Sequence, residues 1–124
     1  MPVVKVWCLP AGLTEDQLRA LHQSVVNEAV AMPEFGIKDE THMTVLFPKD
    51  MMMYGLGSEI IIEVLTGMFH RLELPDEAKT KFARAMVRAV KKLHPEPLVE
   101  CFITPFKRSD GFYDSPEGEP VPDG

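Results

Sequence analysis

Apolar residues recur along the chain in two spacings, and each spacing predicts a different kind of element. Residues 3–9, VVKVWCL, are β-branched or aromatic with little alternation, which predicts a strand buried on both faces. Residues 13–32 predict a helix, because Thr14 and Gln17 form a capping-box pattern in front of apolar residues at helical spacing. Those apolar residues are Leu18, Leu21, Val25, Ala29 and Met32.

The rest of the chain repeats this alternation and then becomes polar. We predict strands over residues 41–47, 59–67 and 98–104, a turn region over 49–58, and a second helix over 75–94. Residues 106–124 are rich in Pro, Gly and acidic side chains, so they are expected to form a C-terminal tail that becomes ordered only where it packs on the domain.

The element order β-α-β-β-α-β predicts an α+β fold. A helix between two strands favours a parallel pair, so we expect a two-layer sandwich with a four-stranded mixed sheet and two helices on one face. Residues 1–105 would form this single domain. Because the strands carry apolar residues on both faces, a monomer would expose one apolar sheet face, which predicts self-association.

Composition and charge exclude several classes of protein. The net charge is -6 over 124 residues, and clustered Lys and Arg are scarce, so we expect no nucleic-acid partner. No apolar run approaches the length of a membrane span, and no signal segment begins the chain, so we expect no membrane association and a cytoplasmic protein. Cys8 and Cys101 lie far apart in apolar stretches, which indicates buried, reduced thiols.

Pro2 directly follows the initiator methionine at the head of the first predicted strand. Proline has no N–H to donate to a sheet, so the first residue of a strand suits it for structural reasons alone. A small residue at position 2 also permits removal of Met1, which would leave Pro2 as a free secondary amine. Such an amine can act as a base, whereas an attached Met1 would make the nitrogen an amide.

Two groups of proteins share this element order, the ferredoxin-like binding modules and the tautomerase superfamily. The chain resembles the second, in its migration-inhibitory-factor branch, through Pro2 and through the stretch over residues 35–59. Within that stretch, Gly36, a strand ending at Pro48, the step Met53-Tyr54-Gly55 and the pair Ser58-Glu59 match the branch. The DGFYD turn over residues 110–114 resembles the family's turn after the last strand.

The resemblance implies that Pro2 moves a proton between carbons of a small enol or keto acid. Such a base works best with a pKa near the working pH, which requires an apolar, desolvated site. A cation must also stabilise the enolate, and Lys38 lies one residue from the position of the branch's substrate lysine. An exposed lysine in an acidic loop is the competing interpretation of Lys38. Tyr54 and Phe112 are candidate pocket aromatics.

Other positions depart from the family pattern. The oxalocrotonate tautomerases have arginines where this chain has Leu13 and Met43, so a diacid held in their manner is not expected. In the last strand, Glu100 and Phe102 replace a tyrosine and an asparagine of the migration-inhibitory-factor branch. Phe102 is either part of a pocket wall or part of the core.

We therefore expect a tautomerase-like isomerase that uses Pro2 as general base and acid. Lys38, Tyr54, Phe102 and Phe112 are its candidate substrate contacts. The resemblance implies a homotrimer whose pocket is completed by a neighbouring subunit, and we expect no metal and no cofactor. The alternatives are a dehalogenase or hydratase that uses the same proline, and a non-catalytic ligand-binding or interaction module.

Overall fold

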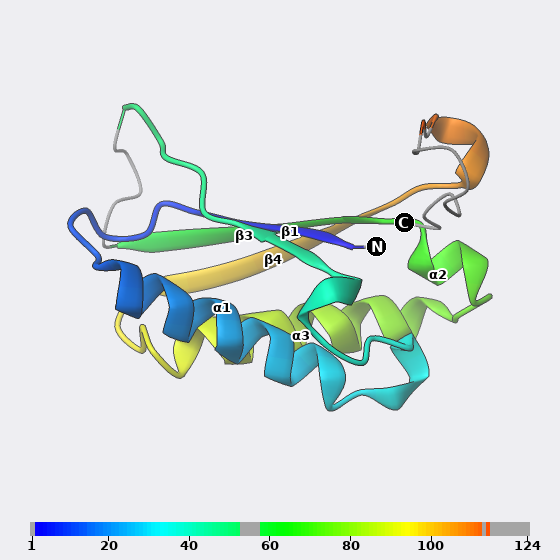
Figure 1. The fold of residues 1–124 in the computed structure, drawn as a ribbon, viewed down its shortest axis with the longest axis horizontal. Coiled ribbons are helices and arrows are strands. Elements are labelled where there is room, and N and C mark those ends of the chain that lie inside the picture. The colour runs from blue at the N-terminus through cyan, green and yellow to red at the C-terminus, as the bar shows by residue number, and fades with distance from the viewer. Residues whose placement is uncertain (1, 53–57, 113, 115–124) are drawn as a thin grey trace.

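The computed structural model describes residues 2–52, 58–112 and 114, which form one layer of helices against one mixed sheet (Figure 1). The sheet has the order β2-β1-β3-β4. Its strands are β1 Val3–Trp7, β2 Thr44–Leu46, β3 Glu59–Thr66 and β4 Leu98–Pro105. This arrangement confirms the predicted α+β sandwich.

Two long helices, α1 Glu15–Val30 and α3 Asp76–Lys91, cover the same face of the sheet (Figure 1). The predicted capping box is present at the start of α1. The Gln17 N–H donates to Thr14 Oγ1 at 3.2 Å, and the Thr14 N–H donates to Gln17 Oε1 at 2.8 Å. The helix layer is tied together by the buried carboxylate of Glu28 in α1, which pairs with Arg88 of α3 and with Lys92 directly after α3.

The sheet consists of two similar halves joined by an antiparallel pair. β1 pairs with β2 in parallel, and β3 pairs with β4 in parallel, as each helical crossover requires. β1 and β3 run antiparallel at the centre, with Val4 opposite Val64 and Val6 opposite Ile62. The first strand therefore starts at the edge of the sheet where the last strand ends.

The core lies between the sheet and the helices. Strand alternation directs Val4, Val6, Ile60, Ile62 and Val64 toward the helices, and each is 0% exposed. We call the opposite side, which no described helix covers, the open face. The prediction that β1 is buried on both faces was wrong for the single chain, because its alternate residues are only half-buried on the open face.

Two local elements differ from the sequence prediction. The strand predicted over residues 41–47 is shorter, because the Asp39 side chain caps a 3₁₀ turn over Glu40–His42 and holds those residues out of the sheet. A one-turn helix, α2 Met68–Arg71, follows β3. Four residues are too few to show helical periodicity, so the sequence pattern missed α2.

Cys8 and Cys101 are free and half-buried, rather than buried as expected. Cys8 directly follows β1, and Cys101 pairs with Ile62 inside the sheet. No helix in the described part of the chain is long and apolar enough to cross a membrane.

The described part of the expected C-terminal tail contacts the domain. The Phe106 N–H donates to the Thr66 carbonyl at 3.1 Å, which continues the β3–β4 ladder by one bond. A 3₁₀ turn, Arg108–Asp110, follows it. The boundary at residue 105 remains a prediction.

Candidate functional site

Pro2 begins the strand β1, which lies inside the sheet between β2 and β3. Its carbonyl accepts a hydrogen bond from the Thr44 N–H at 2.8 Å, so the residue is held against β2. Continuing the strand register by one residue places Pro2 beside Met43 on one side and opposite Thr66 on the other. Thr66 in turn pairs with Pro105. These residues form a row across the end of the sheet at which β1 starts and β3 and β4 finish, and we call this end of the sheet the Pro2 edge.

Three of the four residues of the Pro2 edge are closed to water, and the fourth, Pro105, is exposed. Pro2 is buried, Met43 is 4% exposed and Thr66 is 0% exposed. The Thr66 hydroxyl accepts the Met68 N–H at 3.0 Å, which fixes the start of α2 against the end of β3. The row therefore provides a desolvated setting for any group at the Pro2 nitrogen.

Three aromatic rings support this edge from the helix layer. Phe35 lies against Phe82 and Phe69 with ring centroids 5.1 and 5.8 Å apart, in edge-to-face geometry. All three rings are at most 2% exposed. They come from the 3₁₀ turn Pro33–Phe35, from α2 and from α3, so packed core side chains hold these three segments together.

Lys38 is exposed and lies in the connection that leads into β2. Because β1 and β2 are parallel, this connection enters the sheet at the same edge as Pro2. The Lys38 N–H donates to His42 Nδ1 at 3.1 Å, and the Asp39 carboxylate accepts the Thr41 N–H at 2.8 Å. Hydrogen bonds from the Thr41 hydroxyl and N–H lower the pKa of Asp39, so this turn holds an ionised carboxylate beside Lys38.

Of the predicted aromatic contacts, Phe102 is the one that the sheet geometry separates from Pro2 in the single chain. Phe102 lies on the open face of β4, opposite Glu63, and is 58% exposed. Strand alternation gives Pro2 the orientation of Val4, toward the helices, so Phe102 is on the other face of the same sheet. Phe112 is 90% exposed beyond the 3₁₀ turn, and Tyr54 lies outside the described residues.

The two positions that replace family arginines also lie apart. Met43 is in the Pro2 row, whereas Leu13 lines a cavity at the opposite edge of the sheet. A substrate carboxylate at the Pro2 edge must therefore find its cation elsewhere.

Sequence analysis missed a group of cations at the Pro2 edge. A cavity of about 320 Å³ lies where β4 ends, and His70, Lys79, Pro105, Lys107 and Asp110 are among its lining residues. Pro105 belongs to the Pro2 row, so these charges lie on the same edge as Pro2. His70 belongs to the short helix α2, and Lys79 follows it in the chain. The sequence has no pattern that predicts a helix of four residues, so the approach of these two side chains to the sheet was missed.

A pair of carboxyl groups lies on the open face. Glu59 of β3 and Glu100 of β4 are neighbouring carboxyl groups, and the interaction with Glu59 raises the pKa of Glu100 above its ordinary value. Among the residues that the structure describes, no three His, Cys, Asp or Glu side chains are placed to hold a metal ion.

The fold matches solved structures more clearly than the sequence matches known proteins. A scan of protein-family models finds no match, and a sequence comparison with curated proteins finds none either. A fused 4-OT asymmetric trimer aligns with a TM-score of 0.69 and 15% identity, covering 96% of this chain and 94% of that one. Further fused 4-OT structures are an asymmetric and a symmetric trimer.

Two other structures extend the comparison. A malonate semialdehyde decarboxylase aligns with a TM-score of 0.61 and 16% identity, covering 91% of each chain. The macrophage migration inhibitory factor of Toxoplasma gondii aligns with a TM-score of 0.62 and 17% identity, covering 96% of this chain and 98% of that one. The chain therefore has the fold of the tautomerase superfamily.

Proposed function

We propose that this protein is a tautomerase-like isomerase of the cytoplasm that moves a proton on a small enol or keto acid. The observation that carries the proposal is the position of Pro2, buried in an apolar row at the start of β1. The fold likeness to 4-OT and to malonate semialdehyde decarboxylase supports membership of the tautomerase superfamily.

The chemistry requires that Met1 is removed, because only then is the Pro2 nitrogen a basic secondary amine. Burial disfavours the charged ammonium form, so the pKa of this amine falls toward neutral pH. The amine then takes a proton from one atom of the substrate, and the resulting ammonium returns it to another. Substrate and product differ only in the place of that proton.

Lys38 is the proposed contact for the substrate's carboxylate or enolate oxygen. Its turn is fixed by the bond from its N–H to His42, and the residue is exposed in the connection that leads into β2. A cation placed where negative charge develops stabilises the transition state more than the ground state. Lys107 and Lys79 add positive charge beyond Pro105.

The proposed active form is a homotrimer. Phe102 faces away from the Pro2 edge of its own chain, so it can line a pocket only at a neighbouring chain. Phe112, which is 90% exposed, is a second proposed pocket aromatic. Tyr54 is a proposed third pocket aromatic. The trimeric fused 4-OT neighbours support this assembly.

The decisive experiment measures ketonisation of phenylenolpyruvate by protein whose intact mass shows that Met1 is absent. Pro2→Ala is expected to lower kcat/KM at least 100-fold, because a positioned general base contributes about 10²–10⁴. Pro97→Ala, which changes another buried proline in front of β4, serves as the matched control. Equal rates for wild type and Pro2→Ala, or no activity toward any of several enol acids, would leave the non-catalytic binding module as the better explanation.

The role of Lys38 has its own test. Lys38→Ala is expected to lower kcat/KM and to raise the pKa on the acidic limb of its pH profile, because a like charge beside the amine is removed. Lys81→Ala, which removes a lysine paired with Glu34, controls for loss of surface charge. An unchanged profile with full activity in Lys38→Ala would remove Lys38 from the site.

A further inference from the structure

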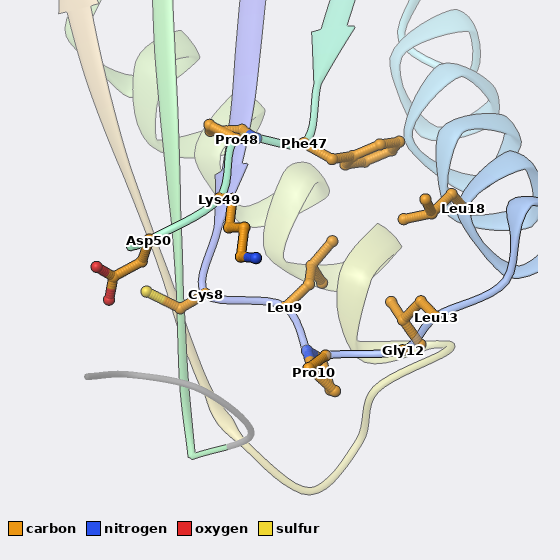
Figure 2. A pocket seen from close by; sticks show the side chains of 11 residues that line it. Cys8, Leu9, Pro10, Gly12, Leu13, Leu18, Phe47, Pro48, Lys49 and Asp50 are labelled. Atoms are coloured by element: carbon orange, nitrogen blue, oxygen red, sulfur yellow. The ribbon is translucent and has the colours of Figure 1, made fainter. Parts of the chain in front are cut away.

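A cavity of about 280 Å³ lies at the edge of the sheet opposite Pro2 (Figure 2). Three segments form it: the loop after β1, the first turn of α1 and the segment that follows β2. Its wall is mostly apolar, with side chains of Leu9, Leu13, Leu18 and Phe47. The volume is close to the lower limit of pockets that hold small organic molecules.

The two halves of the fold build this cavity and the one beside Pro105 from equivalent elements. Each cavity lies between the connection from a strand to a long helix and the segment that follows the next parallel strand. Lys49 follows β2 in the first cavity, as Lys107 follows β4 in the second. The fourth residue of the long helix lines each cavity. It is Leu18 of α1 in the first cavity and Lys79 of α3 in the second. The first cavity is thus the apolar counterpart of the second.

Lys49 supplies the positive charge of the first cavity. Figure 2 shows its side chain extending toward Leu9, with the ammonium beside the stretch that joins Cys8 to Leu9. Within residues 2–52, 58–112 and 114, no carboxylate forms an ion pair with Lys49. The Asp50 carboxylate points away from the leucines and accepts the Met52 N–H at 3.0 Å.

We propose that this cavity is a second ligand site, which binds a small monocarboxylate with an apolar body about the size of a phenyl ring. The apolar body would lie against Leu9, Leu13 and Leu18, where it is removed from water, and the carboxylate would pair with Lys49. Because the cavity is at the other edge of the sheet, the site does not depend on the chemistry at Pro2.

Phenylacetate and its neutral analogue phenylacetamide are the probes, titrated into methyl-labelled full-length protein and followed by NMR. Saturable shifts are expected at the methyl groups of Leu9, Leu13 and Leu18, with a Kd on the order of 1 mM for phenylacetate. Lys49→Met is expected to weaken phenylacetate about tenfold and to leave phenylacetamide unchanged. Leu18→Asn, which makes one wall residue polar without adding a charge, is expected to weaken both.

Lys107→Met is the matched control, since it removes the equivalent lysine from the other cavity and is expected to leave these shifts unchanged. Pro2→Ala is expected to leave them unchanged as well. Shifts that do not saturate, shifts confined to the Pro2 edge, or the same phenylacetate Kd in Lys49→Met and wild type would each overturn the proposal. All of the substituted side chains are at least partly exposed except Pro2, and circular dichroism checks that each variant is folded.

Discussion

The indole N–H of Trp7 donates a hydrogen bond of 2.6 Å to Glu63 Oε1 across the β1–β3 pair. Both side chains lie on the open face, and Trp7 is the only tryptophan in the sequence. Its fluorescence therefore reports on this face alone. If the face becomes buried by another copy of the chain, Trp7 emission moves to shorter wavelength, and dilution reverses the change.

Leu65→Glu is expected to dissociate the assembly, because it introduces a charge on the open face. Leu65 is 45% exposed there, while Leu93 is 44% exposed outside the sheet, so Leu93→Glu is a matched control. Sedimentation should give three times 13.9 kDa for wild type and Leu93→Glu, and a smaller mass for Leu65→Glu. A well-folded monomeric wild type at micromolar concentration would contradict the proposed trimer.

The carboxyl pair of Glu59 and Glu100 predicts a pH dependence of stability. Because the pKa of Glu100 is raised in the folded protein, protonation of Glu100 stabilises the fold. This contribution to the free energy of unfolding is fully present below the pKa of Glu100 in the unfolded chain, and it is lost as pH rises through the folded pKa. Glu59→Gln should lower the pKa of Glu100 toward its ordinary value and remove that loss. Carboxyl ¹³C NMR from pH 3 to 8 measures the shift, and Glu96→Gln provides a control on the exposed loop before β4. An unchanged Glu100 titration in Glu59→Gln would disprove the pairing.

The ion pairs of Glu28 predict that stability depends on pH in the opposite direction to the Glu100 contribution. Its carboxylate pairs with Lys92 at 2.5 Å and Arg88 at 3.0 Å, and the hydrogen bond from Lys92 is the main cause that lowers the pKa of Glu28. A lowered folded pKa stabilises the protein above the unfolded pKa, and the contribution is lost as pH falls through the folded pKa.

Glu28→Gln should reduce the free energy of unfolding by about 1–2 kcal/mol at pH 7, since the carboxylate is buried but both cations are half-exposed. The difference from wild type should shrink below about pH 4. Urea denaturation at several pH values measures this difference in the free energy of unfolding. Glu34→Gln, which removes a more exposed ion pair with Lys81, is the comparison variant. Equal losses in the two variants would mean that burial of Glu28 adds nothing.

Cys101 should resist thiol reagents in the folded protein. Burial raises the pKa of the Cys101 thiol to about 12, so very little thiolate is present at pH 8. Cys8→Ser protein, in which Cys101 is the only remaining cysteine, should react with Ellman's reagent at a rate limited by opening of the structure and rapidly in urea. Fast reaction of folded Cys8→Ser would show that the β3–β4 pair opens readily.

The sequence predicts the fold well because each half combines strong signals. The Thr14 capping box, the helical spacing of apolar residues and the β-branched strands act over long segments, and local preference agrees with packing there. Short features controlled by one side chain were missed, such as the Asp39 cap that shortens β2 and the single turn of α2.

The candidate site was predicted less completely. Parallel pairing alone brings Lys38 to the edge of the sheet that holds Pro2, and the sequence order contains this information. Lys107 comes two residues after β4, so the strand order places it at that edge too, and it was missed because residues 106–124 were interpreted as a tail. Phe102 lies on the open face of the sheet, so its contact with a Pro2 edge depends on the proposed trimer.

The row Pro2–Thr66–Pro105 has a consequence for how the backbone can be connected. Only β3 separates the start of β1 from the end of β4, a distance of roughly 10 Å at ordinary strand spacing. A short linker could therefore join these ends while the chain is opened between β2 and β3, giving a circular permutant with the same sheet. In such a permutant the Pro2 nitrogen is an amide, although every packed contact is retained. The architecture thus has no need for a chain end at Pro2, whereas the proposed chemistry depends on one.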